Sequence, residues 1–114
     1  RKPFDVTVLR TRGLPFTVEN GVIRNLYSLQ LENKSDEPRV YLVAPAADAL
    51  ADHEGVEFIV PQERVVLPAM GGAPVTVFVM MPLDSYTGPI DFAFTFHDSI
   101  GGISDDVAVR FRGP

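Results

Sequence analysis

Two histidines and three methionines are the side chains of this sequence that could bind copper or another transition metal. Histidine is the most common protein ligand of metals, and the methionine thioether binds copper(I). The histidines lack the spacing of a known metal motif, so a surface role for both is the alternative interpretation. The candidate ligands are His53, His97 and Met81, with Met70 as a further thioether. Met80 and Met81 also suit the filling of a hydrophobic core.

Three aspartates, Asp98, Asp105 and Asp106, flank one expected turn near the end of the sequence. Carboxylates on sandwich loops can bind calcium, but they are equally typical of a solvated turn. The segment lacks the central glycine and closing glutamate of an EF-hand loop. Asn33-Lys34-Ser35 matches a glycosylation acceptor, and its alternative interpretation is a turn that the asparagine side chain closes.

Sequence motifs of enzymes do not occur in the chain. It contains no GxSxG elbow, no P-loop and no GxGxxG fingerprint. It also contains no cysteine, so these residues supply no disulfide, zinc–thiolate site or iron–sulfur ligand. Nothing selects two of its fifteen acidic residues as a pair for glycoside hydrolysis. The residues alone predict a domain that is not an enzyme and holds no cofactor.

Size and charge narrow the class of protein further. The 114 residues correspond to one domain, and the hydrophobic fraction of 46% argues against disorder. A net charge of −5 is poor for binding nucleic acid or anionic lipid. No run reaches the roughly 18 apolar residues that cross a bilayer, so we expect no direct membrane insertion by this segment. Because the chain starts at Arg1 and not at a methionine, we expect residues 1–114 to be a single domain cut from a longer protein, with a processed product as the alternative.

The segment from Gly21 to Ser35 has the clearest strand pattern. It follows the hairpin signal Asn20-Gly21, and apolar and polar residues alternate from Tyr27 to Glu32. A period of two residues buries one face of a strand and exposes the other. We therefore expect this segment to be the central strand of the fold.

Short alternating runs separated by proline and glycine fill the rest of the sequence. We expect Met70 to Pro74 to form a flexible turn, and Ala44 to Glu54 to form one helical turn or a loose loop. The pattern predicts an all-β, immunoglobulin-like β-sandwich with seven to nine antiparallel strands in two sheets. The further strands are expected at residues 4–10, 16–18, 39–43, 56–60, 64–67, 75–81, 90–97 and 107–111. The first and last of these could pair with a strand of a partner.

An ordered set of short motifs runs from one end of the chain to the other: Arg1-x-Pro3-Phe4, Arg10-Thr11-Arg12, Gly21-x-Ile23-x-Asn25-x-Tyr27-x-Leu29, Asn33-Lys34-Ser35 and Phe111-Arg112-Gly113-Pro114. Together these motifs resemble the C-terminal domain of the FixG/CcoG family. Two loops depart from the family pattern: Gly13-Leu14-Pro15 replaces an Asn-rich turn, and Ala44 to Gly55 is longer and Ala-rich.

The resemblance implies a functional context. FixG/CcoG proteins are inner-membrane proteins that hold iron–sulfur clusters and take part in assembling the cbb-type cytochrome oxidase, by reducing copper. Their C-terminal domain is immunoglobulin-like and is expected on the periplasmic side of the bacterial inner membrane. This chain lacks cysteine, so the clusters are expected in an N-terminal part outside it. The resemblance transfers no catalytic residue to these positions.

Four of the matching residues suit structural roles. Arg12 and Asn25 could pin the loop between the first two strands, and Tyr27 is placed like a core residue whose hydroxyl needs a partner. Asn33 could close its turn through its own side chain.

Three hypotheses for function remain at this point. The first is a non-catalytic interaction domain that contacts a protein, either its own membrane redox part or a partner in oxidase assembly. The second is a copper-handling domain that uses His53, His97 and a methionine. The third is an extracytoplasmic adhesion or carbohydrate-binding sandwich. That class needs exposed aromatic platforms, whereas the chain has no tryptophan and three scattered tyrosines.

Overall fold

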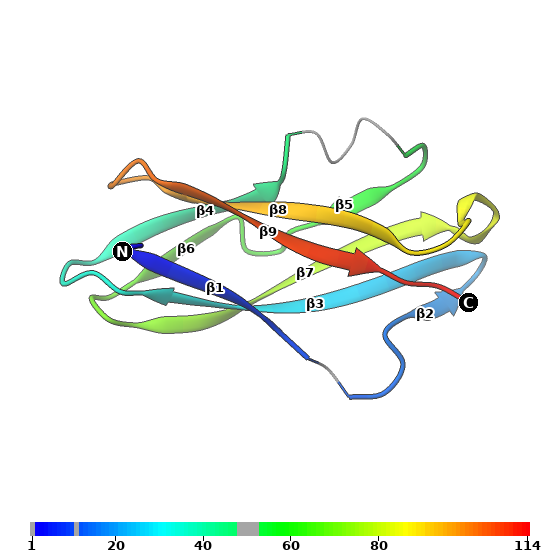
Figure 1. Cartoon of the computed structure of the whole chain (residues 1–114), viewed down its shortest axis with the longest axis horizontal. Coiled ribbons are helices and arrows are strands. Elements are labelled where there is room, and N and C mark those ends of the chain that lie inside the picture. The colour runs from blue at the N-terminus through cyan, green and yellow to red at the C-terminus, as the bar shows by residue number, and fades with distance from the viewer. Residues whose placement is uncertain (1, 11, 48–52) are drawn as a thin grey trace.

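The computed structural model describes residues 2–10, 12–47 and 53–114. They form nine strands in two antiparallel sheets that pack face to face as a β-sandwich (Figure 1). One short 3₁₀ helix, η1 (Leu83–Ser85), is the only helical element of this part of the chain. No helix of the described residues is long and apolar enough to cross a membrane. The expected all-β, immunoglobulin-like fold class is confirmed.

The first sheet has five strands, and β3 lies inside it. The strand order is β1-β3-β7-β5, and β2 pairs with β3 on the side where β1 also pairs. Because β3 has neighbours on both sides, the expectation of a central strand is confirmed. The strands are β1 (Phe4–Leu9), β2 (Thr17–Glu19), β3 (Val22–Asn33), β7 (Gly72–Pro82) and β5 (Glu57–Ile59).

The turn between β2 and β3 explains where β3 begins. Glu19 pairs with Val22, so the hairpin loop consists of Asn20 and Gly21 alone. Both residues have positive φ angles, 52° and 74°, as a tight type I′ hairpin turn requires. Asparagine and glycine tolerate this conformation best, and the expected hairpin is confirmed.

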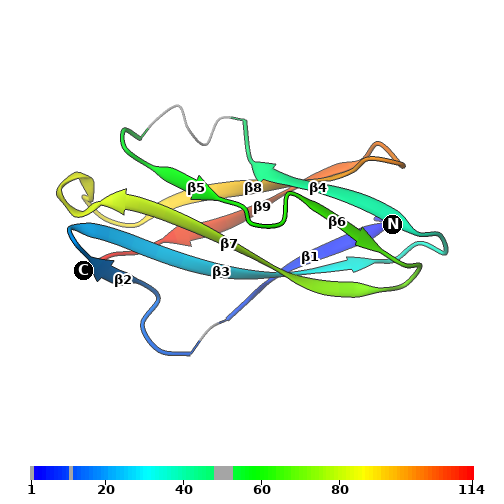
Figure 2. The ribbon, with the colours of Figure 1, turned by 180° about the vertical axis from the view of Figure 1, so that it is seen from behind.

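The second sheet has the strand order β6-β4-β8-β9. Its last strand, β9, and the first strand of the other sheet, β1, are both edge strands, and they contact each other along one open side of the sandwich (Figures 1 and 2). The two edge strands expected from the sequence are confirmed. The strands are β6 (Arg64–Leu67), β4 (Arg39–Pro45), β8 (Ile90–Asp98) and β9 (Ser104–Phe111).

The core lies between the sheets and is built from alternate residues of the long strands. Rings from both sheets meet edge to face: Phe58 lies 5.2 Å from Phe92, and Phe92 lies 6.1 Å from Phe111. Each fully buried large apolar side chain contributes roughly 1.5–3 kcal/mol. The largest fully buried side chains are Tyr41, Phe4, Phe94, Phe96, Phe111, Ile23, Leu29, Leu31, Met81, Val75, Val77 and Val79.

The segment from Gly72 to Pro74 begins β7, so the expectation of a flexible turn extending to Pro74 is wrong. The Asn33 N–H donates to the Gly71 carbonyl at 2.8 Å, which sets the alternation of hydrogen bonds between β3 and β7. In that alternation Pro74 points its nitrogen away from β3, toward a side where β5 pairs only with residues 78–80. A proline fits there because no ladder hydrogen bond is lost.

The end of β1 also differs from the expected pattern. Phe4 is buried, but Val8, expected on the same inward face, is 41% exposed. Pairing of β1 with β3 ends at Leu9 and Ser28, and the chain then leaves the sandwich (Figure 1). In the expected loop from Ala44 to Glu54, strand β4 continues to Pro45, and residues 48–52 lie outside the described part.

Candidate functional site

A network of polar side chains, which we call the polar junction, joins the two sheets near the β3–β4 and β8–β9 turns. The Asn33 amide, 1% exposed, donates to the carbonyls of Glu37 at 2.9 Å and Pro68 at 3.0 Å. Its oxygen accepts from the Ser35 N–H at 2.9 Å and the Ser35 hydroxyl at 2.7 Å. Asn33 therefore closes its own turn and also ties it to the chain that precedes β7. The members of the polar junction are Asn33, Ser35, Arg39, Tyr41 and Asp98.

Asp98 ends β8 inside this junction and is 1% exposed. Its Oδ1 accepts from the N–H groups of Ile100 at 3.0 Å and Gly101 at 2.8 Å, which closes the β8–β9 turn. Its Oδ2 has no hydrogen-bond partner among the described residues, and Arg39 Nε lies 3.9 Å away. The charge of Arg39 compensates that buried carboxylate, so the junction is neutralised from within.

Tyr41 lies beside Asp98 on the neighbouring strand β4 and is fully buried. Burial raises the pKa of its phenol, the negative charge of Asp98 raises it further, and Arg39 lowers it. The hydroxyl has no hydrogen-bond partner among the described residues. The phenol therefore stays neutral within the junction.

At the opposite end of the sandwich, β3 holds the chain that follows β9. The Asn25 amide nitrogen donates to the Arg112 carbonyl at 2.9 Å, and its oxygen accepts from the Arg112 N–H at 2.9 Å. The side-chain amide thus pairs with the backbone as a neighbouring strand would. The Tyr27 hydroxyl donates to the Arg110 carbonyl at 2.9 Å. We call these three contacts the C-terminal clamp.

The clamp corrects one expectation. Asn25 pins the chain after β9 and not the loop between the first two strands, and Arg12 is exposed in a surface hollow. The reason is the burial of Asn25 on the inner face of β3, which points its amide across the open side toward the other sheet. Tyr27 is half-buried, and its hydroxyl has the partner that the sequence suggested it would need. Burial raises the pKa of the Tyr27 phenol well above its ordinary value, and Arg112 lowers it slightly.

Two adjoining hollows lie beside the clamp, and together we call them the arginine groove. One, of about 310 Å³, lies beside β2, and the other, of about 530 Å³, lies between the end of β1 and β9. Pro15 and Leu26 line both hollows. Among the described residues, every charged residue that lines them is an arginine: Arg10, Arg12, Arg24, Arg110 and Arg112.

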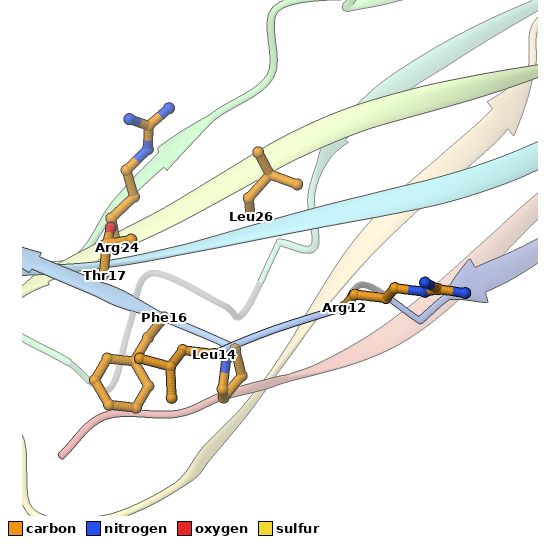
Figure 3. Close-up of a pocket in the computed structure, with 7 residues that line it drawn as sticks. Arg12, Leu14, Phe16, Thr17, Arg24 and Leu26 are labelled. Carbon is orange, nitrogen blue, oxygen red and sulfur yellow. The ribbon is translucent and has the colours of Figure 1, made fainter.

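The arginines frame an apolar centre. Figure 3 shows Arg12 and Arg24 extending away from the first hollow in different directions, with Leu26 between them. The Arg24 guanidinium lies 4.2 Å from the ring centre of Phe78, and Arg110 pairs with Asp91 at 2.9 Å. That hydrogen bond to Arg110 lowers the pKa of the Asp91 carboxyl.

The structure places His97 away from both His53 and Met81. His97 lies on the outward face of β8 with its Nδ1 2.6 Å from the Ser104 hydroxyl, whereas Met81 is buried between the sheets. His53 packs against Phe92 at 5.5 Å, five residues and roughly 16 Å along β8 from His97. Met70 is 65% exposed in the turn before β7. Among the described residues, no three His, Cys, Asp or Glu side chains cluster as a metal site.

The other candidate sites are also dispersed. Asp98 points into the junction, Asp105 pairs with Lys2 at 3.1 Å, and Asp106 accepts from Thr95 at 2.7 Å. Asp105 and Asp106 are adjacent strand residues and therefore lie on opposite faces of β9. The three tyrosines form no exposed platform, because Tyr41 is buried and the other two pack partly buried against the core.

The arginine groove was not predicted from the sequence. A signal was present, because Arg10-x-Arg12 and Arg110-x-Arg112 each place two arginines on one face of an extended chain. The order of the strands was needed to show that the end of β1 and the end of β9 lie close together. It was also needed to show that Arg24 of β3 lines the same groove.

Comparison with known proteins gives a single family. Residues 1–114 match a family model described as "IG-like fold at C-terminal of FixG, putative oxidoreductase". A comparison with curated protein sequences gave no match. Among solved structures, the chain is similar to a FixG-related protein from Vibrio parahaemolyticus, with a TM-score of 0.77, 18% identity, and coverage of 98% of this chain and 97% of that one.

Two more distant structures share the sandwich fold. The N-terminal domain of PorA gives a TM-score of 0.60 at 19% identity, covering 85% of this chain and 81% of that one. The ASH/PapD-like domain 7 of human CEP192 gives 0.53 at 15% identity, covering 95% and 81%. At these identities the likeness shows the fold alone.

Proposed function

Because this chain belongs to the family of immunoglobulin-like domains at the C-terminus of FixG, we propose that it is a non-catalytic interaction domain of a membrane-bound redox protein. The observation that carries the proposal is the family match over all 114 residues. The two neighbouring edge strands support it, since exposed strand edges and the surface between them are common sites of protein recognition.

The redox chemistry belongs, in this proposal, to another part of the same protein. That part holds the iron–sulfur clusters, spans the inner membrane and reduces copper for the assembly of a cbb-type cytochrome oxidase. The domain lies on the periplasmic side and contacts either that part or an assembly partner. The lack of cysteine is consistent with this division, because cluster ligands are mostly cysteine thiolates.

A deletion in the full-length parent protein tests the proposal. The domain is removed, membranes are solubilised, and the co-purifying proteins are compared with those of the intact parent, together with oxidase activity. We expect cluster content to remain and at least one partner and part of the oxidase activity to be lost. Retention of every partner and of full oxidase activity would refute the proposal.

A copper-handling function is not favoured by the geometry. Copper(I) sites need two or three soft ligands within bonding distance of one ion. His97 and Met81 are separated by the thickness of the second sheet, since one faces outward from β8 and the other points into the core.

A further inference from the structure

The arginine groove combines positive charge with exposed apolar side chains on a protein of net negative charge. Five of the ten basic residues line it, which leaves five bases against fifteen acids elsewhere in the sequence. Four large apolar side chains in the same hollows are exposed: Val8 and Leu9 at 41%, Leu14 at 80% and Leu26 at 44%. Such a surface is complementary to a partner with carboxylates beside apolar side chains.

The backbone of the groove offers main-chain hydrogen bonds as well. Pairing with β1 ends at Ser28 and pairing with β2 begins at Arg24, so neither strand pairs with the three residues between them. The alternation along β3 turns the N–H and C=O of Leu26 toward this gap. By the same alternation, Val8 of β1 and Ala108 of β9 turn theirs toward the open side of the sandwich.

From these features we infer that the arginine groove binds an extended acidic segment of a partner protein, in which carboxylate and apolar residues alternate. In an extended chain, successive side chains point to opposite sides. One set can contact Leu26 and Leu9 while the other meets the guanidinium groups of Arg10 and Arg112. The inference rests on the proposed function and names the surface and the kind of partner through which it acts.

Two kinds of anionic ligand other than a protein fit less well. A bilayer surface is broad and flat, whereas the groove is a concavity between two strands. Nucleic acid carries a negative charge at every phosphate, so the acidic remainder of the molecule would repel it more strongly than a short segment in which half of the residues are apolar. Lipid vesicles and an oligonucleotide therefore serve as comparison probes in the experiment.

The test uses the 114-residue chain and a labelled, end-blocked peptide of about eight residues, in which glutamate alternates with valine. At about 3.3 Å per residue, the extended peptide is about 26 Å long. Fluorescence anisotropy gives the affinity at low and high salt. The comparison probes are the same peptide with lysine in place of glutamate, phosphatidylglycerol vesicles and an oligothymidylate. We expect binding of the glutamate peptide that weakens with salt, and at least tenfold weaker binding of the other probes.

Matched variants locate the binding. Arg10→Glu combined with Arg112→Glu should lower the affinity for the glutamate peptide at least tenfold. Arg64→Glu combined with Lys34→Glu makes the same change in net charge away from the groove and should change affinity less than twofold. Leu26→Ala should weaken binding severalfold, and Val66→Ala, at an exposed strand residue of β6 away from the groove, should not. Circular dichroism checks that each variant is folded.

Three outcomes would overturn the inference: no binding of the glutamate peptide, equal losses in the groove and control variants, or stronger binding of vesicles or oligothymidylate through the same arginines. The proposed function is judged separately. If deletion of the domain removes a partner but the full-length protein with Arg10→Glu and Arg112→Glu retains it, the interaction function stands and the groove is not its surface.

Discussion

The two ends of the sandwich differ in whether their charged side chains are buried and paired or exposed to solvent. At the polar junction, Asn33 and Asp98 are each 1% exposed, their hydrogen bonds go to turns, and Arg39 forms an ion pair with Asp98 at 3.9 Å. At the other end, the C-terminal clamp satisfies the chain after β9, while Arg10 and Arg112 are exposed in the groove beside it. The first end balances its charge internally, whereas the second presents an excess of positive charge to solvent.

This difference indicates that the buried polar groups stabilise the fold, whereas the exposed arginines are available to bind a partner. Buried polar groups that are bonded to one another fix turns and register, and removing one leaves its partners unsatisfied. Exposed charges contribute little to stability and much to the choice of a partner. Substitutions at the junction should therefore change stability, whereas those in the groove should change binding.

The largest effect is expected for Asn33→Ala at the polar junction. The change removes two donated and two accepted hydrogen bonds from a buried site, so it should lower the free energy of unfolding by about 3 kcal/mol. Urea denaturation followed by circular dichroism measures it. Gln30→Ala on the same strand is the control, expected within about 0.5 kcal/mol of wild type. Equal stability of the two variants would show that the junction does not stabilise the fold.

Asn25→Ala breaks the C-terminal clamp, and we expect a loss of about 2 kcal/mol because the Arg112 N–H and carbonyl both lose a partner. Hydrogen exchange should also accelerate at the Arg112 amide while the Val107 amide, within the β8–β9 ladder, stays protected. Unchanged exchange at Arg112 would mean that another group holds this segment.

Tyr27→Phe removes the third contact of the clamp and should cost about 1 kcal/mol near neutral pH. Its raised pKa also couples the clamp to pH. The folded protein holds this proton more tightly than the unfolded chain, so the contribution is complete below about pH 10 and is lost as the pH rises above it. Denaturation between neutral and alkaline pH should show stability falling less steeply above pH 10 in Tyr27→Phe than in wild type. Equal slopes would contradict the burial of this phenol.

Asp91→Asn is expected to have the smallest effect on stability. Unlike the substitutions in the groove, it should strengthen binding of the glutamate peptide. Its pair with Arg110 is exposed on both sides, so the unfolding midpoint should not change measurably. Loss of the pair frees the Arg110 guanidinium, and the glutamate peptide should bind about twofold more tightly. Unchanged binding would place Arg110 outside the recognition surface.

The sequence predicted the fold well because a period of two residues is a direct consequence of the strand pleat. It identified β3, its Asn20-Gly21 turn and the inward phenylalanines of β8 from local patterns alone. It missed the start of β7 at Gly72 to Pro74, because glycine and proline are typical of turns. A proline fits within a strand only where its nitrogen faces away from the paired neighbour, and the sequence does not show which side that is. The candidate site was harder to predict, since the arginine groove joins residues about a hundred positions apart.

The order of the strands also determines how the domain would respond to tension. The described chain begins at one end of a molecule 47 Å long and leaves at the other (Figure 1). A pull on the two ends would slide β1 along β3 and β9 along β8, so the bonds of each ladder would be loaded together in shear and not opened one by one. The C-terminal clamp adds the Asn25 and Tyr27 side chains to the bonds that must break. We therefore expect the domain to resist a pull along its long axis more strongly than a pull that peels one strand from its neighbour.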